Sequence, residues 1–93
     1  MKILAIEIKL YAPWVQSLKE KRMVVKSILG KLQNKFNVSV AEIDTQDMHK
    51  TITIGIIAIV ENTTYADQLA DAIENFVECN TEAEIIEFVN EIR

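Results

Sequence analysis

The sequence predicts an α+β fold in which two helices cover one face of a four-stranded antiparallel sheet. Two segments place apolar residues at helical spacing, and four others alternate or are rich in β-branched residues. Their order along the 93 residues is strand–helix–strand–strand–helix–strand. Two right-handed split crossovers in this order give a ferredoxin-like sandwich with strand order 4-1-3-2. A chain of this length is expected to form one domain, residues 1–93.

The first strand and the first helix are predicted by two different periodicities. Residues 2–11 alternate, as a half-buried strand does. Ser17 is expected to open the helix, because Glu20 three residues later completes a capping box. Asn37 is expected to end it in a left-handed turn, which Asn tolerates better than most residues. The apolar stripe of this helix consists of Leu18, Val25, Ile28, Leu29, Leu32 and Phe36.

The rest of the chain predicts three strands and one helix. Residues 38–43 favour a short strand, and the polar residues 44–50 favour a connecting loop. Residues 51–60 are so rich in β-branched side chains that they predict a central strand. A second amphipathic helix is expected over about residues 65–78, and a last strand over residues 83–92.

The charge is divided unevenly along the chain. Residues 1–36 hold eight Lys and Arg against two acids, whereas residues 37–93 hold two against twelve. The net charge of −4 argues against indiscriminate nucleic-acid binding, but a basic face on an acidic body is compatible with it. The alternative is that the two oppositely charged helices attract each other or are simply solvated.

Other features narrow the class of protein. The single cysteine, Cys79, excludes an internal disulfide and a cysteine-based zinc site. No apolar run is long enough to span a bilayer. Glu7 and Lys9 interrupt the apolar start of the chain, which argues against a signal peptide. We therefore expect a cytoplasmic protein that has no membrane partner.

The predicted topology brings two polar segments to one end of the molecule, because the first two strands run in the same direction. The start of the first helix contributes Gln16, Ser17, Lys19, Lys21 and Arg22. The loop after the second strand contributes Asp44, Gln46, Asp47, His49 and Lys50. Trp14, at the same end, is either a hydrophobic plug over the helix start or an exposed stacking ring.

Residues 17–47 read SLKEKRMVVKSILGKLQNKFNVSVAEIDTQD, in which SLK-x-KR is followed by FNVSVAE-x-D-x-QD. On this long and specific pattern, nearly the whole chain closely resembles the YlxP-like family of small bacterial proteins, domain-of-unknown-function family 503. The resemblance implies a ferredoxin-like fold and no established activity. It also hints at RNA or the ribosome, since bacterial members are often encoded beside translation-initiation and ribosome-assembly factors.

The first functional hypothesis is a module that binds ribosomal or other structured RNA. At 100° per residue, Lys19, Arg22 and Lys26 form one stripe beside a helix N-terminus, which suits phosphate. Lys21 lies near the buried arc and is expected to reach Asp44 or Asp47, so an ion-pair network is the alternative. The candidate phosphate-binding residues are Gln16, Ser17, Lys19, Lys21, Arg22 and Lys26. The candidate loop, as ligand or ion-pair groups, consists of Asp44, Gln46, Asp47 and His49.

The second hypothesis is a protein-interaction domain that forms a homodimer through the sheet face without helices. Antiparallel neighbours create an apolar patch there, of the kind that marks a partner surface. The expected self-interface consists of Ile3, Ala5, Ile57 and Ile59. Thr53 is expected to point outward on this face, which Ile85 and Val89 join in one of the registers open to the last strand.

The third hypothesis is an enzyme that uses the carboxylates of residues 42–47, with magnesium. Glu42 and Asp44 are two residues apart and are expected on one strand face. Neighbouring Lys and Arg would compete for these carboxylates, and no nucleophile or glycine-rich phosphate loop accompanies them. We therefore predict a non-enzymatic protein with no metal, no cofactor and no small-molecule substrate.

Overall fold

The computed structural model describes residues 1–93 and confirms the predicted order of elements. The elements are β1 (Lys2–Tyr11), α1 (Leu18–Lys35), β2 (Ser39–Ile43), β3 (Thr51–Val60), α2 (Thr63–Asn80) and β4 (Glu84–Ile92). The strands form one sheet in the order β2-β3-β1-β4, which is the predicted order read from the other edge. Every neighbouring pair of strands is antiparallel.

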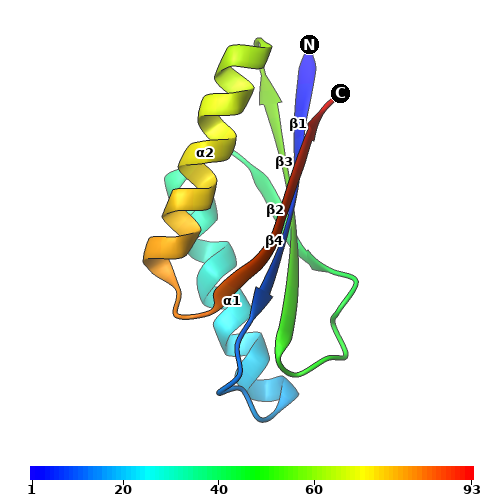
Figure 1. Ribbon diagram of the computed structural model, residues 1–93, viewed down its shortest axis with the longest axis vertical. Helices are drawn as coiled ribbons and strands as arrows, with labels where there is room; N and C mark the ends of the chain where they lie inside the picture. Colours follow the sequence, from blue (N-terminus) through cyan, green and yellow to red (C-terminus); the bar gives the residue numbers. More distant parts are fainter.

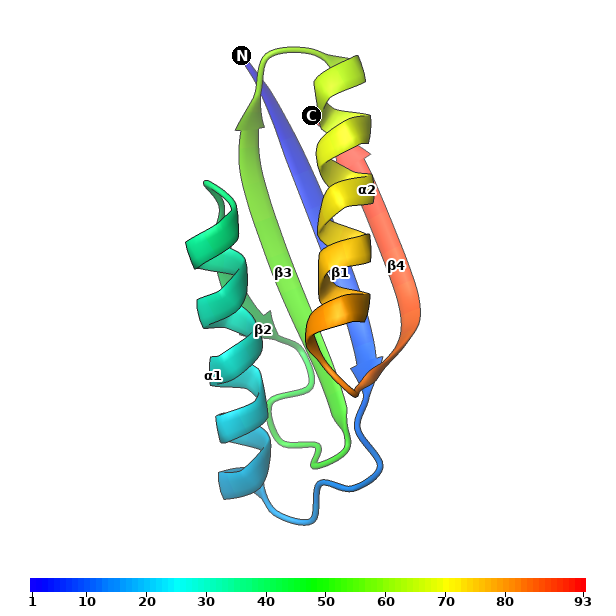
Figure 2. The ribbon, with the colours of Figure 1, turned by 90° about the vertical axis from the view of Figure 1, so that its left-hand side faces the viewer.

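Both helices lie on the same face of this sheet, and no helix covers the other face (Figure 1). We call the face without helices the open face. Seen from the helix side, α1 lies towards β2 and β3, and α2 lies towards β1 and β4 (Figure 2). Neither helix combines the length and the apolar character needed to cross a membrane.

The core lies between the helices and the sheet, because alternation along the central strands sends one set of side chains to this side. One cluster contains 19 buried apolar residues. In β1 this set consists of Leu4, Ile6, Ile8 and Leu10. From α1, Val25, Ile28 and Leu32 pack against them, as the predicted stripe requires. Phe36, just after α1, and Phe76 of α2 meet edge to face with ring centroids 5.4 Å apart.

Side chains cap the beginnings of both helices. The Glu20 amide donates to Ser17 Oγ at 3.1 Å, which confirms the predicted cap of α1. Glu20 Oε1 in turn accepts from the Gln16 amide at 2.7 Å, one residue before the usual partner in a capping box. At the start of α2, Asn62 Oδ1 accepts from the Tyr65 amide at 2.8 Å.

The predicted left-handed turn at Asn37 is wrong. Helix α1 ends at Lys35, and its C-cap residue Phe36 has an extended backbone with φ of −125°. Asp44 is the one non-glycine residue with positive φ. The reason is that β2 begins only a few residues after the helix, at Ser39, so the chain leaves α1 already extended.

The open face differs from the expectation at two positions. Thr53 is fully buried, because the loop after β2 folds over it and brings Thr45 Oγ1 within 3.0 Å of Thr53 Oγ1. Ile85 pairs with Leu10 and packs against the core, because the register of β4 on β1 shifts between Lys9 and Leu10. Val89, by contrast, is 53% exposed.

The capping contact predicts the effect of Ser17→Ala. Removing the hydroxyl acceptor leaves the Glu20 amide without its partner, so the free energy of unfolding should fall by about 1 kcal/mol. Urea denaturation followed by circular dichroism measures this change. Ser27→Ala, at an exposed position inside the same helix, is the control and should not lower stability, because Ala favours helix. Equal loss in both variants would contradict the capping role.

Candidate functional site

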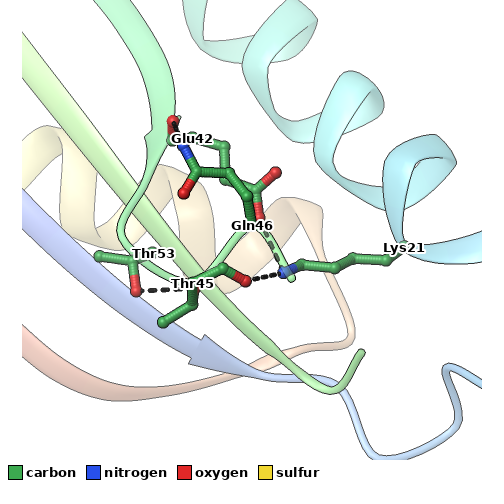
Figure 3. Close-up of polar contacts among 5 residues, drawn as sticks. All are labelled: Lys21, Glu42, Thr45, Gln46 and Thr53. Atoms are coloured by element: carbon green, nitrogen blue, oxygen red, sulfur yellow. Dashed lines mark hydrogen bonds and ion pairs between the residues drawn. The ribbon is translucent and has the colours of Figure 1, made fainter. Parts of the chain in front are cut away.

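The structure brings the two predicted polar segments together at one end, around a buried lysine (Figure 3). Lys21 of α1 is 1% exposed, and its Nζ lies 2.8 Å from Glu42 Oε2 of β2. The same amine donates a hydrogen bond to the Thr45 carbonyl. Gln46 Nε2 donates to the Glu42 carbonyl at 3.3 Å. We call Lys21, Glu42, Thr45, Gln46 and Thr53 the Lys21 cluster.

The Lys21 cluster holds an ammonium group that is excluded from water. Such a group is costly to bury unless an opposite charge and hydrogen-bond acceptors surround it. Glu42, whose side chain is 16% exposed, supplies the charge, and the Thr45 carbonyl supplies the acceptor. Glu42 Oε2 is buried and makes no hydrogen bond, so its contact with Nζ is an ion pair without hydrogen-bond geometry.

The expectation that Lys21 reaches Asp44 or Asp47 is therefore wrong, since its partner is Glu42. Glu42 pairs with Ile54 in the sheet register and, like that core residue, faces the helices. Asp44 follows the end of β2 with φ of 58°, so strand alternation does not extend to it. For the same reason, Glu42 and Asp44 do not share a strand face as expected. The amine of Lys21, which is predicted above as a phosphate ligand, is buried and is not accessible to a phosphate group in solvent.

The candidate loop residues lie at the surface. Asp44, Gln46, Asp47 and His49 are all exposed. Gln46 alone among them makes a side-chain hydrogen bond, to the Glu42 carbonyl, and none of the four takes part in an ion pair. No group of three or more His, Cys, Asp or Glu side chains is close enough together to hold a metal ion. The loop therefore presents polar side chains separately and does not gather them around one point.

A second lysine, for which the sequence predicts no role, joins the two segments. Lys50 Nζ donates to the carbonyls of Pro13 and Val15, at 2.6 and 2.9 Å. The Ala12 amide donates to the Lys50 carbonyl at 2.8 Å. The predicted topology placed Lys50 at this end, but no local pattern distinguishes a lysine that binds backbone carbonyls from one that is solvated.

The three predicted cations of α1 are exposed and unpaired. Lys19, Arg22 and Lys26 are all on the surface and lie within about 60° of one another around the helix axis. The ion pairs of the structure are Lys21–Glu42 and Arg93–Glu91, so none of the three takes part in one. We call Lys19, Arg22 and Lys26 the basic stripe.

The basic stripe faces away from the acidic helix α2. The side of α1 that approaches α2 carries Lys31, whose Nζ donates to the Asn80 carbonyl at 3.0 Å. At 100° per residue, this side lies roughly 120 to 180° from the basic stripe. Attraction between the helices therefore involves Lys31 and leaves the stripe free. Of the other predicted phosphate ligands, Ser17 caps the helix and the Gln16 amide binds Glu20.

Comparison with known proteins confirms the family resemblance. A family model described as protein of unknown function (DUF503) matches residues 3–89. The chain is 40% identical over 68 residues to a curated protein of Bacillus subtilis (strain 168) named uncharacterized protein YlxP. The alignment covers 73% of this chain and 74% of that relative. Neither name states an activity, a ligand or a partner.

The Lys21 cluster predicts that substitution of two lysines five residues apart on α1 has very different effects on protein stability. Lys21→Met leaves the Glu42 carboxylate without its partner, so the free energy of unfolding should fall by about 3 kcal/mol. The control is Lys26→Met, at an exposed and unpaired position, which should change stability by less than about 0.5 kcal/mol. Chemical denaturation of both variants measures the difference.

A second substitution separates the lost charge pair from lost packing. Adding Glu42→Leu to Lys21→Met removes the stranded carboxylate and should restore most of the lost stability. If the double variant is less stable than Lys21→Met alone, the ion pair is not the interaction that Lys21→Met disrupts.

Proposed function

The chain belongs to the DUF503 family of proteins of unknown function, and we propose that it is a non-enzymatic module that binds ribosomal or other structured RNA through the basic stripe. The observation that carries this proposal is the arrangement of Lys19, Arg22 and Lys26. They are exposed, unpaired and on the side of α1 that faces away from the acidic helix. The ferredoxin-like classification of the fold is part of the same proposal.

Phosphate groups are the ligands that best fit such a stripe. Three neighbouring cations whose charge no carboxylate offsets create a local positive potential on a protein of net charge −4. Each cation that neutralises an RNA phosphate releases a bound counterion, so binding weakens steeply with salt. The negative charge of the rest of the molecule limits contact with RNA to this face, which favours a docked particle over indiscriminate coating.

Charge reversal of the basic stripe tests the proposal. The native protein should sediment with ribosomal subunits from a bacterial lysate at low salt and be released at high salt. Lys19/Arg22/Lys26→Glu should abolish this association, because three phosphate contacts become repulsive. With a defined RNA, the slope of log affinity against log salt should become shallower by about two to three.

The matched control is Lys2/Lys9/Arg93→Glu, which changes the net charge by the same amount but touches no residue of α1. It should keep most of the association. If both triple variants lose binding equally, net charge and not the stripe is responsible. If the folded native protein does not sediment with subunits at any salt concentration, the ribosome is not its partner.

A second candidate function is self-association through the open face. Ile57, Ile59 and Val89 are 53%, 71% and 53% exposed there. A shallow hollow of about 530 Å³ lies among Ala5, Gly55 and Ile57, and Gly55 gives Ile43 room to lie across it. A specific interface between two such faces would need to bury at least about 1,000 Å² in total. We propose a second copy of the chain as the occupant, and this interface is compatible with RNA on the helix side.

Charged substitutions on the open face test this candidate. Ile59→Glu, and likewise Ile57→Glu, should convert a dimer to a monomer in sedimentation velocity, because a carboxylate would be desolvated at the interface. Self-association of the native protein should survive high salt. The control is Ala72→Glu, an exposed position on α2 in the helix layer. A native protein that is monomeric at all concentrations measured rules out this function.

A further inference from the structure

A groove lies beside α1, next to the basic stripe. Phosphate binding by the stripe gives this groove no role. The groove has a volume of about 560 Å³ and runs between α1 and the connection from α2 to β4. Trp14, Met23, Val24 and Ile28 supply apolar walls, and Ser27 supplies a hydroxyl. Trp14 is 39% exposed and Met23 is 67% exposed. A small domain that leaves its one tryptophan and a methionine in solvent within a groove has the kind of surface that receives a partner.

The tryptophan is held at the surface by its neighbours. Ala12 and Val15 are fully buried, whereas Pro13 and Trp14 between them are exposed. Lys50 Nζ binds the carbonyls on both sides of Trp14, those of Pro13 and Val15. The backbone that carries the indole is thereby fixed from two directions before any ligand arrives. Such preorganisation reduces the entropy that binding must offset.

The groove and the basic stripe form one continuous surface. Met23 lines the groove and follows Lys19 by four residues and precedes Lys26 by three, spacings that make neighbours on a helix. Lys19 and Lys26 therefore border the groove on its Met23 side, whereas Lys31 and Glu82 line its other side, towards the end of α2. RNA in single-stranded form offers the matching pair of groups, phosphates for the cations and unstacked bases for the aromatic ring. A purely apolar protein anchor would make no use of the adjacent unpaired charges.

We propose that this groove receives an unpaired base of the RNA strand whose phosphates the basic stripe neutralises, with the base stacked on Trp14. The inference rests on the proposed function and makes it specific, because it names single-stranded or looped RNA as the ligand. Met23 covers the base from the helix side, and the Ser27 hydroxyl is available to its polar edge. Such a site binds unpaired bases and does not select one particular nucleotide sequence.

The single tryptophan makes the proposal directly measurable. A 12-nucleotide single-stranded RNA should quench the fluorescence of the native protein, since Trp14 is its sole tryptophan. The same strand annealed into a duplex should bind more weakly and quench little. Trp14→Ala should bind the labelled single strand about tenfold more weakly by anisotropy, and Trp14→Phe should keep part of that affinity. Duplex binding should be the same in all three proteins.

Matched controls separate this inference from the proposed function. Tyr65→Ala removes an exposed aromatic ring on α2, away from the groove, and should leave single-strand affinity unchanged. Equal binding of single strand and duplex without quenching overturns the stacking role while the basic stripe stands. Saturation by a mononucleotide as tight as by the strand also overturns it, because the ligand is then a small molecule. Absence of binding to either RNA overturns both proposals.

Discussion

The buried ammonium of Lys21 is the interaction on which the position of α1 depends. A charge that is 99% buried tolerates few arrangements, because each displacement from its partners exposes the full cost of desolvation. Its partners are Glu42 on the edge strand β2 and the Thr45 carbonyl in the following loop. This contact therefore ties α1 to the edge strand, which the backbone ladder with β3 holds in the sheet.

The orientation of α1 that buries Lys21 also decides which charges the protein presents. With Lys21 inward, the helix turns Lys19, Arg22 and Lys26 outward and directs Lys31 towards the end of α2. Lysines on one helix thus have three different roles: one inside the protein, one at the C-terminus of the neighbouring helix, and two, with Arg22, free for a ligand. Lys50 completes this division by fixing the loop that carries Trp14.

The sequence was sufficient to predict the elements and the strand order, because periodicity and β-branched runs report directly on which faces are buried. It failed where tertiary context decides. The bulge at Lys9 and Leu10 reverses the face of Ile85, and the loop over Thr53 buries an outward position; neither leaves a local signal. The basic stripe was visible as helical spacing. Glu42 is the partner of Lys21 because β2 ends at Ile43, so the alternation that turns Glu42 towards the helices does not extend to Asp44.

The proposed RNA-binding surface is the side of the molecule formed by the basic stripe and the Trp14 groove. Ultraviolet cross-linking of the native protein to RNA in bacterial cells, followed by mass spectrometry of the linked peptides, tests it most directly. We expect the RNA-linked peptides to come from residues 14–26, which hold Trp14 and all three cations of the stripe. Cross-links confined to β1 and β3 on the open face, or no cross-link to RNA at all, would show that RNA does not bind the basic stripe and the Trp14 groove.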